Sequence, residues 1–167
     1  MPNWCNNDVT IKHKDKAAIE RVAKAFNEGR LCNEFIPLPE ELAETTSPNR
    51  SGNENELIEK YGYSNWYDFQ VSKWGTKWDI SPDGGNAIVK GKKVCLNFDS
   101  AWSPPVGLYE KLIEEGYEVE AYYFEGGMGF YGCFTNDGEE QFEYTNISDV
   151  PEKYDVLFNI KETYEEF

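Results

Sequence analysis

Carboxylate side chains in the last third of the chain are the groups best placed to act as a set. Residues 116–167 hold thirteen acids against two lysines, so they carry −11 of the net charge of −15. Glu118 and Glu120 alternate along one predicted strand, which places them on one face about 7 Å apart. Carboxylates fixed in a row imitate the phosphates that a basic groove neutralises, and they repel nucleic acid and anionic lipid.

A final helix is predicted to extend this acidic face, because Asp155, Glu162 and Glu166 recur at spacings of seven and four. We therefore predict that the chain inhibits a nucleic-acid-binding protein by occupying its basic groove. The predicted partner-binding residues are Glu118, Glu120, Glu139, Glu140, Glu143, Asp155, Glu162, Glu165 and Glu166. The alternative is that these charges serve solubility alone.

Tryptophan, tyrosine and lysine are interleaved over residues 61–78, a pattern typical of two different structures. Exposed rings beside lysines form stacking platforms for single-stranded nucleic acid, whereas buried tryptophans fill the core of a small sheet protein. We expect core packing, and the alternative function is a single-stranded nucleic-acid-binding module that uses the tryptophan and lysine segment 66–78. Its site would comprise Trp74, Lys77, Trp78, Asp79 and Trp102. An enzyme is a third hypothesis, which requires buried carboxylates to converge in one pocket with Trp74, Lys77 and Asp79.

Three short motifs have simple structural interpretations. The GxGxxG pattern at 127–132 is flanked by aromatic strands rather than by a strand and a helix, so it predicts a tight hairpin or a bulge rather than a dinucleotide site. His13, the single histidine, has no partner at metal-ligand spacing and is expected to be a solvated loop residue. Asn136-Asp137-Gly138 predicts a turn. We therefore predict no catalytic residue, no metal and no cofactor.

The elements that position these residues follow from the periodicity of the apolar side chains. Strands are predicted at 7–12, 31–36, 86–90, 93–99, 117–125, 130–135 and 139–144, and helices at 18–26, 54–61, 65–73, 106–113 and from Pro151. Ser103 is expected to cap the fourth helix, and Ser148 or Asp149 the last. This order predicts an α+β fold, a ferredoxin-like and mainly antiparallel sheet with helices on one face. Residues 38–80 form an aromatic-rich insertion, and residues 116–167 form an acidic region that ends in a helix.

Size and composition indicate one elaborated domain over residues 1–167. No apolar run approaches the ~20 residues of a membrane span, and the amino terminus lacks the pattern of a secretory signal. The four cysteines are scattered, without a CxxC pair, and are expected to be reduced in the cytoplasm.

Four segments together resemble a known family. They are Asn3-Trp4-Cys5-Asn6-Asn7, Lys73-Trp74-Gly75-Thr76-Lys77-Trp78-Asp79, Asp99-Ser100-Ala101-Trp102-Ser103-Pro104-Pro105 and the glycine-aromatic stretch 125–132. They are similar to the phage- and plasmid-encoded YubB-like family, a ferredoxin-like domain of unknown function. The resemblance implies a mobile-element protein that works in the cytoplasm of a bacterial host cell. Together with the acidic face, it implies that the inhibited protein is a host defence or nucleic-acid-binding protein, as for an anti-CRISPR or anti-restriction protein. It implies no catalytic residues, and the acidic carboxyl-terminal region lies outside it.

Overall fold

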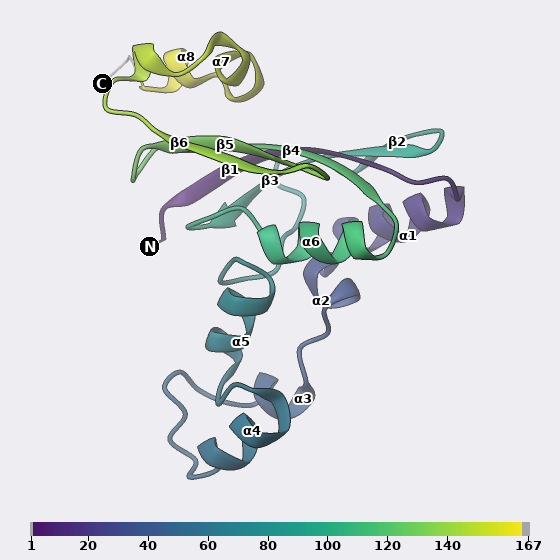
Figure 1. The fold of residues 1–167 in the computed structure, drawn as a ribbon, viewed down its shortest axis with the longest axis vertical. Helices are drawn as coiled ribbons and strands as arrows, with labels where there is room; N and C mark the ends of the chain where they lie inside the picture. The colour runs from purple at the N-terminus through teal and green to yellow at the C-terminus, as the bar shows by residue number, and fades with distance from the viewer. Residues whose placement is uncertain (1, 165–167) are drawn as a thin grey trace.

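One antiparallel sheet organises the computed structural model, which describes residues 2–164 (Figure 1). Its strands lie in the order β2-β3-β1-β4-β5-β6, and each neighbouring pair is antiparallel. The strands are β1 (Trp4–Lys12), β2 (Ile88–Lys90), β3 (Lys93–Ala101), β4 (Glu118–Glu125), β5 (Phe130–Thr135) and β6 (Gly138–Glu143). The fold is α+β, as predicted.

The ferredoxin-like part runs β1-α1-β2-β3-α6-β4, with α1 (Lys16–Asn27) and α6 (Val106–Glu114) on the same face of the sheet (Figure 1). Alternation along β1 explains this layer, because Val9 and Ile11 are buried under the helices while their neighbours point to the other face. Ile19, Val22 and Phe26 of α1 recur at helical spacing and complete the core. The hairpin of β5 and β6 then widens the sheet beyond β4.

Four short helices lie between α1 and β2 and project from the sheet (Figure 1). They are α2 (Leu31–Phe35), α3 (Glu40–Ala43), α4 (Glu54–Tyr61) and α5 (Trp66–Lys73). The prediction of a strand at 31–36 was wrong. The carboxylate of Asp79 accepts hydrogen bonds from the N–H groups of Cys32 (2.7 Å) and Asn33 (2.9 Å), which caps α2 from 47 residues away along the chain.

A second helical layer covers the opposite face of β4, β5 and β6 (Figure 1). It consists of η1 (Ile147–Asp149), α7 (Glu152–Phe158) and α8 (Ile160–Tyr164). Tyr154 and Ile160 are buried against Phe124 of β4. The predicted continuous last helix was wrong, because Asn159 adopts a left-handed conformation (φ 53°) that separates α7 from α8.

Neither predicted serine cap is present. The helix α6 begins after Pro105, and the hydroxyl of Ser103 instead donates to the carbonyl of Gly75 at 2.6 Å. The helix α7 begins after Pro151, and no side chain of the described residues caps its first turn. Over residues 2–164, no helix combines the length and the apolar content needed to cross a bilayer.

Candidate nucleic-acid interface

Aromatic rings surround the ammonium group of Lys77 near one end of the sheet. Its Nζ lies 4.6 Å from the ring centre of Trp78, 5.1 Å from that of Trp102 and 5.8 Å from that of Tyr67. Trp4 extends the group, because its ring centre is 6.1 Å from that of Trp78. We call these five residues the aromatic platform. Cation–π attraction holds an ammonium over ring faces in this way.

The tryptophans of the platform are open to solvent. Trp4 is 44% exposed, Trp102 39% and Trp78 38%, and Lys77 is half-buried between them. A large ring is more stable out of water, so several exposed tryptophans side by side make this surface a candidate for binding. Within residues 2–164, no carboxylate forms an ion pair with Lys77.

Four separate segments supply the platform. Trp4 begins β1, Tyr67 lies in the first turn of α5, Trp78 follows α5 and Trp102 follows β3. The insertion therefore brings its own rings to the end of the sheet, where the two strands already contribute one each. Residues far apart in the sequence meet at this surface, as they do in binding sites generally.

Hydrogen bonds join the two loops that carry the platform. Thr76 Oγ1 donates to the carbonyl of Ala101 at 3.0 Å, and Ser103 Oγ donates to that of Gly75. Both bonds link the segment before Trp78 to the segment around Trp102. The rings are therefore presented by ordered backbone, which lowers the entropy that a ligand must remove on binding.

Trp102 has a backbone conformation that bulky residues rarely adopt. Its φ is 72°, in the left-handed region that favours glycine. The N–H of Trp102 donates to the carbonyl of Asn3 at 2.8 Å, which holds this conformation. Such strain costs about 1–3 kcal/mol and is concentrated at functional sites. Its occurrence at an exposed tryptophan supports a role for this ring beyond packing.

The predicted alternative site divides into two parts. Lys77, Trp78 and Trp102 come together, so the expectation of core packing was wrong for these two tryptophans. Trp74 does pack in the core, where its Nε1 donates to the carbonyl of Ile36 at 2.8 Å. Asp79 caps α2, and burial raises the pKa of its carboxyl although three backbone N–H groups oppose that shift.

Sequence reasoning did not assign Trp4 to the site. Trp4 had one available signal, because it opens a strand that alternates strictly and therefore stands on the face opposite Cys5. Tyr67 lies in the aromatic and lysine segment that the sequence singled out, but it was not chosen as a site residue, because its contact with Lys77 depends on how the insertion folds back onto the sheet.

The nine acids predicted to form one face do not share one. Cross-strand pairing puts Glu118, Glu120 and Glu140 on the face that η1, α7 and α8 partly cover. Glu139 and Glu143 point to the opposite face, and the carboxylate of Glu139 accepts a hydrogen bond from Tyr123 at 3.0 Å. The cause is the two-residue period of the strand, which sends successive side chains to opposite faces.

The remaining four acids do not extend a row. Asp155 accepts the N–H of Lys161 at 2.8 Å and Glu162 accepts the side-chain amide of Asn159 at 2.7 Å, so both stabilise the break between α7 and α8. Glu165 and Glu166 lie outside the described residues.

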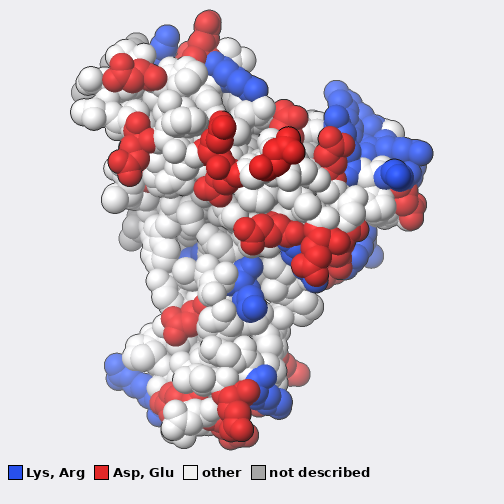
Figure 2. Space-filling model, in the orientation of Figure 1, with Lys and Arg blue, Asp and Glu red and all other residues white. Residues whose placement is uncertain are grey.

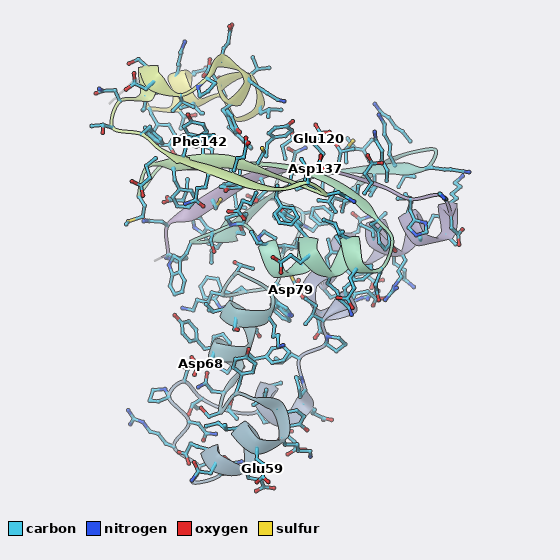
Figure 3. The ribbon with its side chains drawn as sticks, viewed as in Figure 1. Glu59, Asp68, Asp79, Glu120, Asp137 and Phe142 are labelled. Carbon is cyan, nitrogen blue, oxygen red and sulfur yellow. The ribbon has the colours of Figure 1, made fainter. Side chains whose placement is uncertain are left out.

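A narrower acidic feature remains at the edge strand. The residues of β6 are exposed along its whole length, and it carries carboxylates on both faces. Acidic side chains follow this edge of the sheet in Figure 2, and Figure 3 shows Glu120 and Asp137 at the same end of it. Over residues 2–164, Glu118, Glu120, Glu139, Glu140 and Glu143 form no ion pair.

A polar cavity of about 430 Å³ lies between strands β1 and β3 and the helices α7 and α8. A neighbouring pocket that Asp83 and Asp99 share with Trp4 places it beside the platform. Asp83 and Asp99 also line the cavity, and the amide of Asn6 donates to Asp99 at 2.6 Å. Burial, together with a hydrogen bond to the carboxyl of Asp83, raises the pKa of Asp99 to about 6.

This carboxyl pair predicts a pH-dependent stability. Because the folded state raises the pKa of Asp99, its contribution to the free energy of unfolding is fully present below pH ~4 and is lost as pH rises through about 6. Asp99→Asn keeps the acceptor for Asn6 and removes the charge. We expect it to stabilise the protein by about 1 kcal/mol at pH 7, a discounted value for a half-buried group. Urea unfolding at pH 4.5 and pH 7 measures this, and an equal effect at both pH values would contradict it.

The described residues show no group of three or more histidine, cysteine or acidic side chains that could hold a metal ion. No family model matches the chain, and no curated protein does. One matching solved structure is that of a protein api92 from Yersinia pseudotuberculosis, which is assigned to the family model DUF1281. It is 13% identical, covers 87% of this chain and 99% of its own, and superimposes with a TM-score of 0.41. That likeness carries no argument about function, and the resemblance to the YubB-like family stays a prediction.

Proposed function

We propose that the protein binds single-stranded nucleic acid on the aromatic platform. The observation that carries this proposal is the position of Lys77, whose ammonium lies between three ring faces that also meet solvent. A nucleotide matches both parts of the platform, because its base can stack on a ring and its phosphate can pair with the ammonium of Lys77. Stacking tolerates any base, so little sequence preference is expected.

The platform lies at the end of the sheet rather than on its open face. Many RNA-binding sheets of this architecture stack bases on aromatic residues in the central strands. Here the open face of β1 carries Asn6, Asp8 and Thr10, which oppose Asp99, Asn97 and Cys95 of β3. The rings that β4 carries on this face, Tyr122 and Phe124, pack against the second helical layer, so the loops supply the exposed rings instead. With a net charge of −15, affinity should be modest and should fall as salt screens Lys77.

Removal of either of two rings of the platform is expected to weaken binding of an oligothymidylate by about tenfold or more, since each stacked base contributes about 1–3 kcal/mol. The variants are Trp78→Leu and Trp102→Gly. Glycine adopts the left-handed φ of residue 102 without strain, so the second variant should keep the backbone conformation of this loop. Quenching of tryptophan fluorescence during titration measures the affinity.

Phe142→Leu is the matched control, because Phe142 is an exposed ring on β6 that lies outside the platform. It should bind as the unaltered protein does. The proposal fails if all three variants bind alike, or if the unaltered protein shows no binding in low salt while circular dichroism shows it to be folded.

A second candidate function rests on the carboxylates along β6, which form no ion pair within residues 2–164. Exposed acids without cationic partners attract a basic protein surface, such as the groove of a host defence protein. The test is capture of a bacterial DNA-binding protein that added duplex DNA releases. The triple variant Glu139→Gln, Glu140→Gln and Glu143→Gln should no longer capture it. Capture by the variant as well would remove this candidate.

A further inference from the structure

A basic groove opens at the end of the sheet opposite the aromatic platform. Its volume is about 500 Å³, and Gly116 and Glu118 complete a lining of basic residues. We call it the lysine groove, and its basic lining residues are Lys12, His13, Lys14, Lys90, Lys92 and Lys93. Figure 2 shows lysine and arginine gathered at the end of the molecule where Figure 1 places β2. The groove is an exception in a chain of net charge −15.

Lysines oppose each other directly across three strands of this groove. Lys12 of β1 pairs in register with Lys93 of β3, and Lys93 pairs with Lys90 of β2. Like charges in directly opposite positions destabilise a sheet. Glu118, the one acid that lines the groove, opposes Lys12 from β4. A single carboxylate leaves most of the positive charge uncompensated.

Ion pairs within the chain do not offset this repulsion. In the part of the chain that the structure describes, none of the five groove lysines lies within 4 Å of a carboxylate oxygen. The nearby Asp15 is committed to capping α1, where it accepts the N–H of Ala17 at 2.9 Å. An external anion is the partner that would neutralise the cluster.

His13 is held so that one nitrogen can contact a ligand. Its Nδ1 accepts the N–H of Asp15 at 2.9 Å, so the proton of the neutral ring resides on Nε2. The ring packs against Tyr117 with 4.6 Å between centres. The backbone N–H of His13 donates to the carbonyl of Lys92 at 3.1 Å, which ties the end of β1 to the β2–β3 turn. The groove therefore has a fixed wall and a fixed donor beside its lysines.

We propose that the lysine groove binds a ligand that carries two or more linked phosphate groups. Several ammonium groups in one concave site match several phosphates, and a single small anion would leave most of them unpaired. The groove is about 27 Å from the platform along β1, so it is a separate site. The phosphates can come from a free polyphosphate compound or from the backbone of a nucleic acid, and the two have the same binding chemistry.

Inorganic tripolyphosphate and an oligothymidylate are the two probes, titrated at low salt by calorimetry. The test variant is Lys90→Glu with Lys92→Glu, in a hairpin whose side chains are exposed. Lys24→Glu with Lys161→Glu is the control, because it changes the net charge equally on exposed residues outside the groove. Reversing the charge at position 90 replaces its repulsion of Lys93 by attraction, so the test variant should be at least as stable as the unaltered protein in urea.

Tripolyphosphate affinity should fall about tenfold or more in the test variant and change less than about threefold in the control. If the test variant loses affinity for the oligothymidylate but not for tripolyphosphate, the groove still binds phosphates, and their source is the backbone of a nucleic acid. Equal affinities of the test and control variants for both probes would overturn the proposal. Failure of this proposal can be distinguished from failure of the proposed function, because Trp78→Leu should leave tripolyphosphate binding unchanged if the two sites are distinct.

Discussion

Gly107→Ala is expected to destabilise the protein by about 3 kcal/mol, although alanine is the better helix former. Gly107 lies in the first turn of α6, which crosses the end of α5. A Cβ at this position would overlap the carbonyl oxygen of Lys73 and lie 2.8 Å from its carbonyl carbon. These are backbone atoms, so they cannot rotate away as a flexible side chain would. Urea unfolding measures the change.

The same substitution should weaken the platform, since α5 carries Tyr67 and precedes Lys77. Gly84→Ala is the control, because a Cβ there meets no atom within 4 Å and its φ is not left-handed. That variant should unfold within about 0.5 kcal/mol of the unaltered protein. Equal stability of the two variants would show that the close contact between α5 and α6 is not a constraint on the fold.

Glu125→Ala should cost about 3 kcal/mol, because it removes a buried acceptor from the β4–β5 turn. The side chain of Glu125 is fully buried, and its two carboxylate oxygens accept the N–H groups of Gly127 at 2.6 Å and Met128 at 2.7 Å. Alanine leaves both donors without this partner and creates a void. Denaturant unfolding reports the loss.

Glu125→Gln separates shape from hydrogen bonding. Glutamine has the same volume but only one acceptor oxygen, so it should cost less than alanine. Glu143→Ala is the exposed control and should change stability by about 0.5 kcal/mol or less. If Glu125→Ala behaves like that control, water replaces the carboxylate and the turn does not depend on it.

The sheet was largely predictable, because its signals are local. Alternation in β1, β3 and β4 and the Gly91-Lys92 turn each depend on neighbouring residues, and each was placed within a few positions. The glycine-aromatic stretch was also interpreted correctly as a hairpin. Its Gly132 packs where a Cβ would lie 2.5 Å from the hydroxyl of Tyr123, so the glycines serve close packing between strands.

The errors arose where the local sequence is compatible with two structures. Leu31, Cys32 and Phe35 fit a short helix as well as a strand, and the cap from Asp79 settles the choice. The last helix breaks at Asn159, a residue that tolerates left-handed backbone but does not require it. Composition gives no sign of either outcome.

The candidate site was half predictable for the same reason. Lys77, Trp78 and Trp102 were grouped because aromatic and basic residues cluster in the sequence. Whether each ring is buried depends on packing of the insertion, and Trp74 and Trp78 had opposite outcomes four residues apart. The lysine groove was not anticipated, because Lys12 and Lys90 are brought together only by the strand order.

The edge strand β6 also determines what kind of chain could extend the sheet. Its outer backbone groups have no neighbouring strand among the described residues, so a peptide could add as a seventh strand. Glu140 on one face and Glu139 and Glu143 on the other would flank that peptide on both sides. An incoming strand must therefore bring cationic side chains at odd and even positions alike. A second copy of β6 would fail this requirement, which protects the protein from pairing with itself.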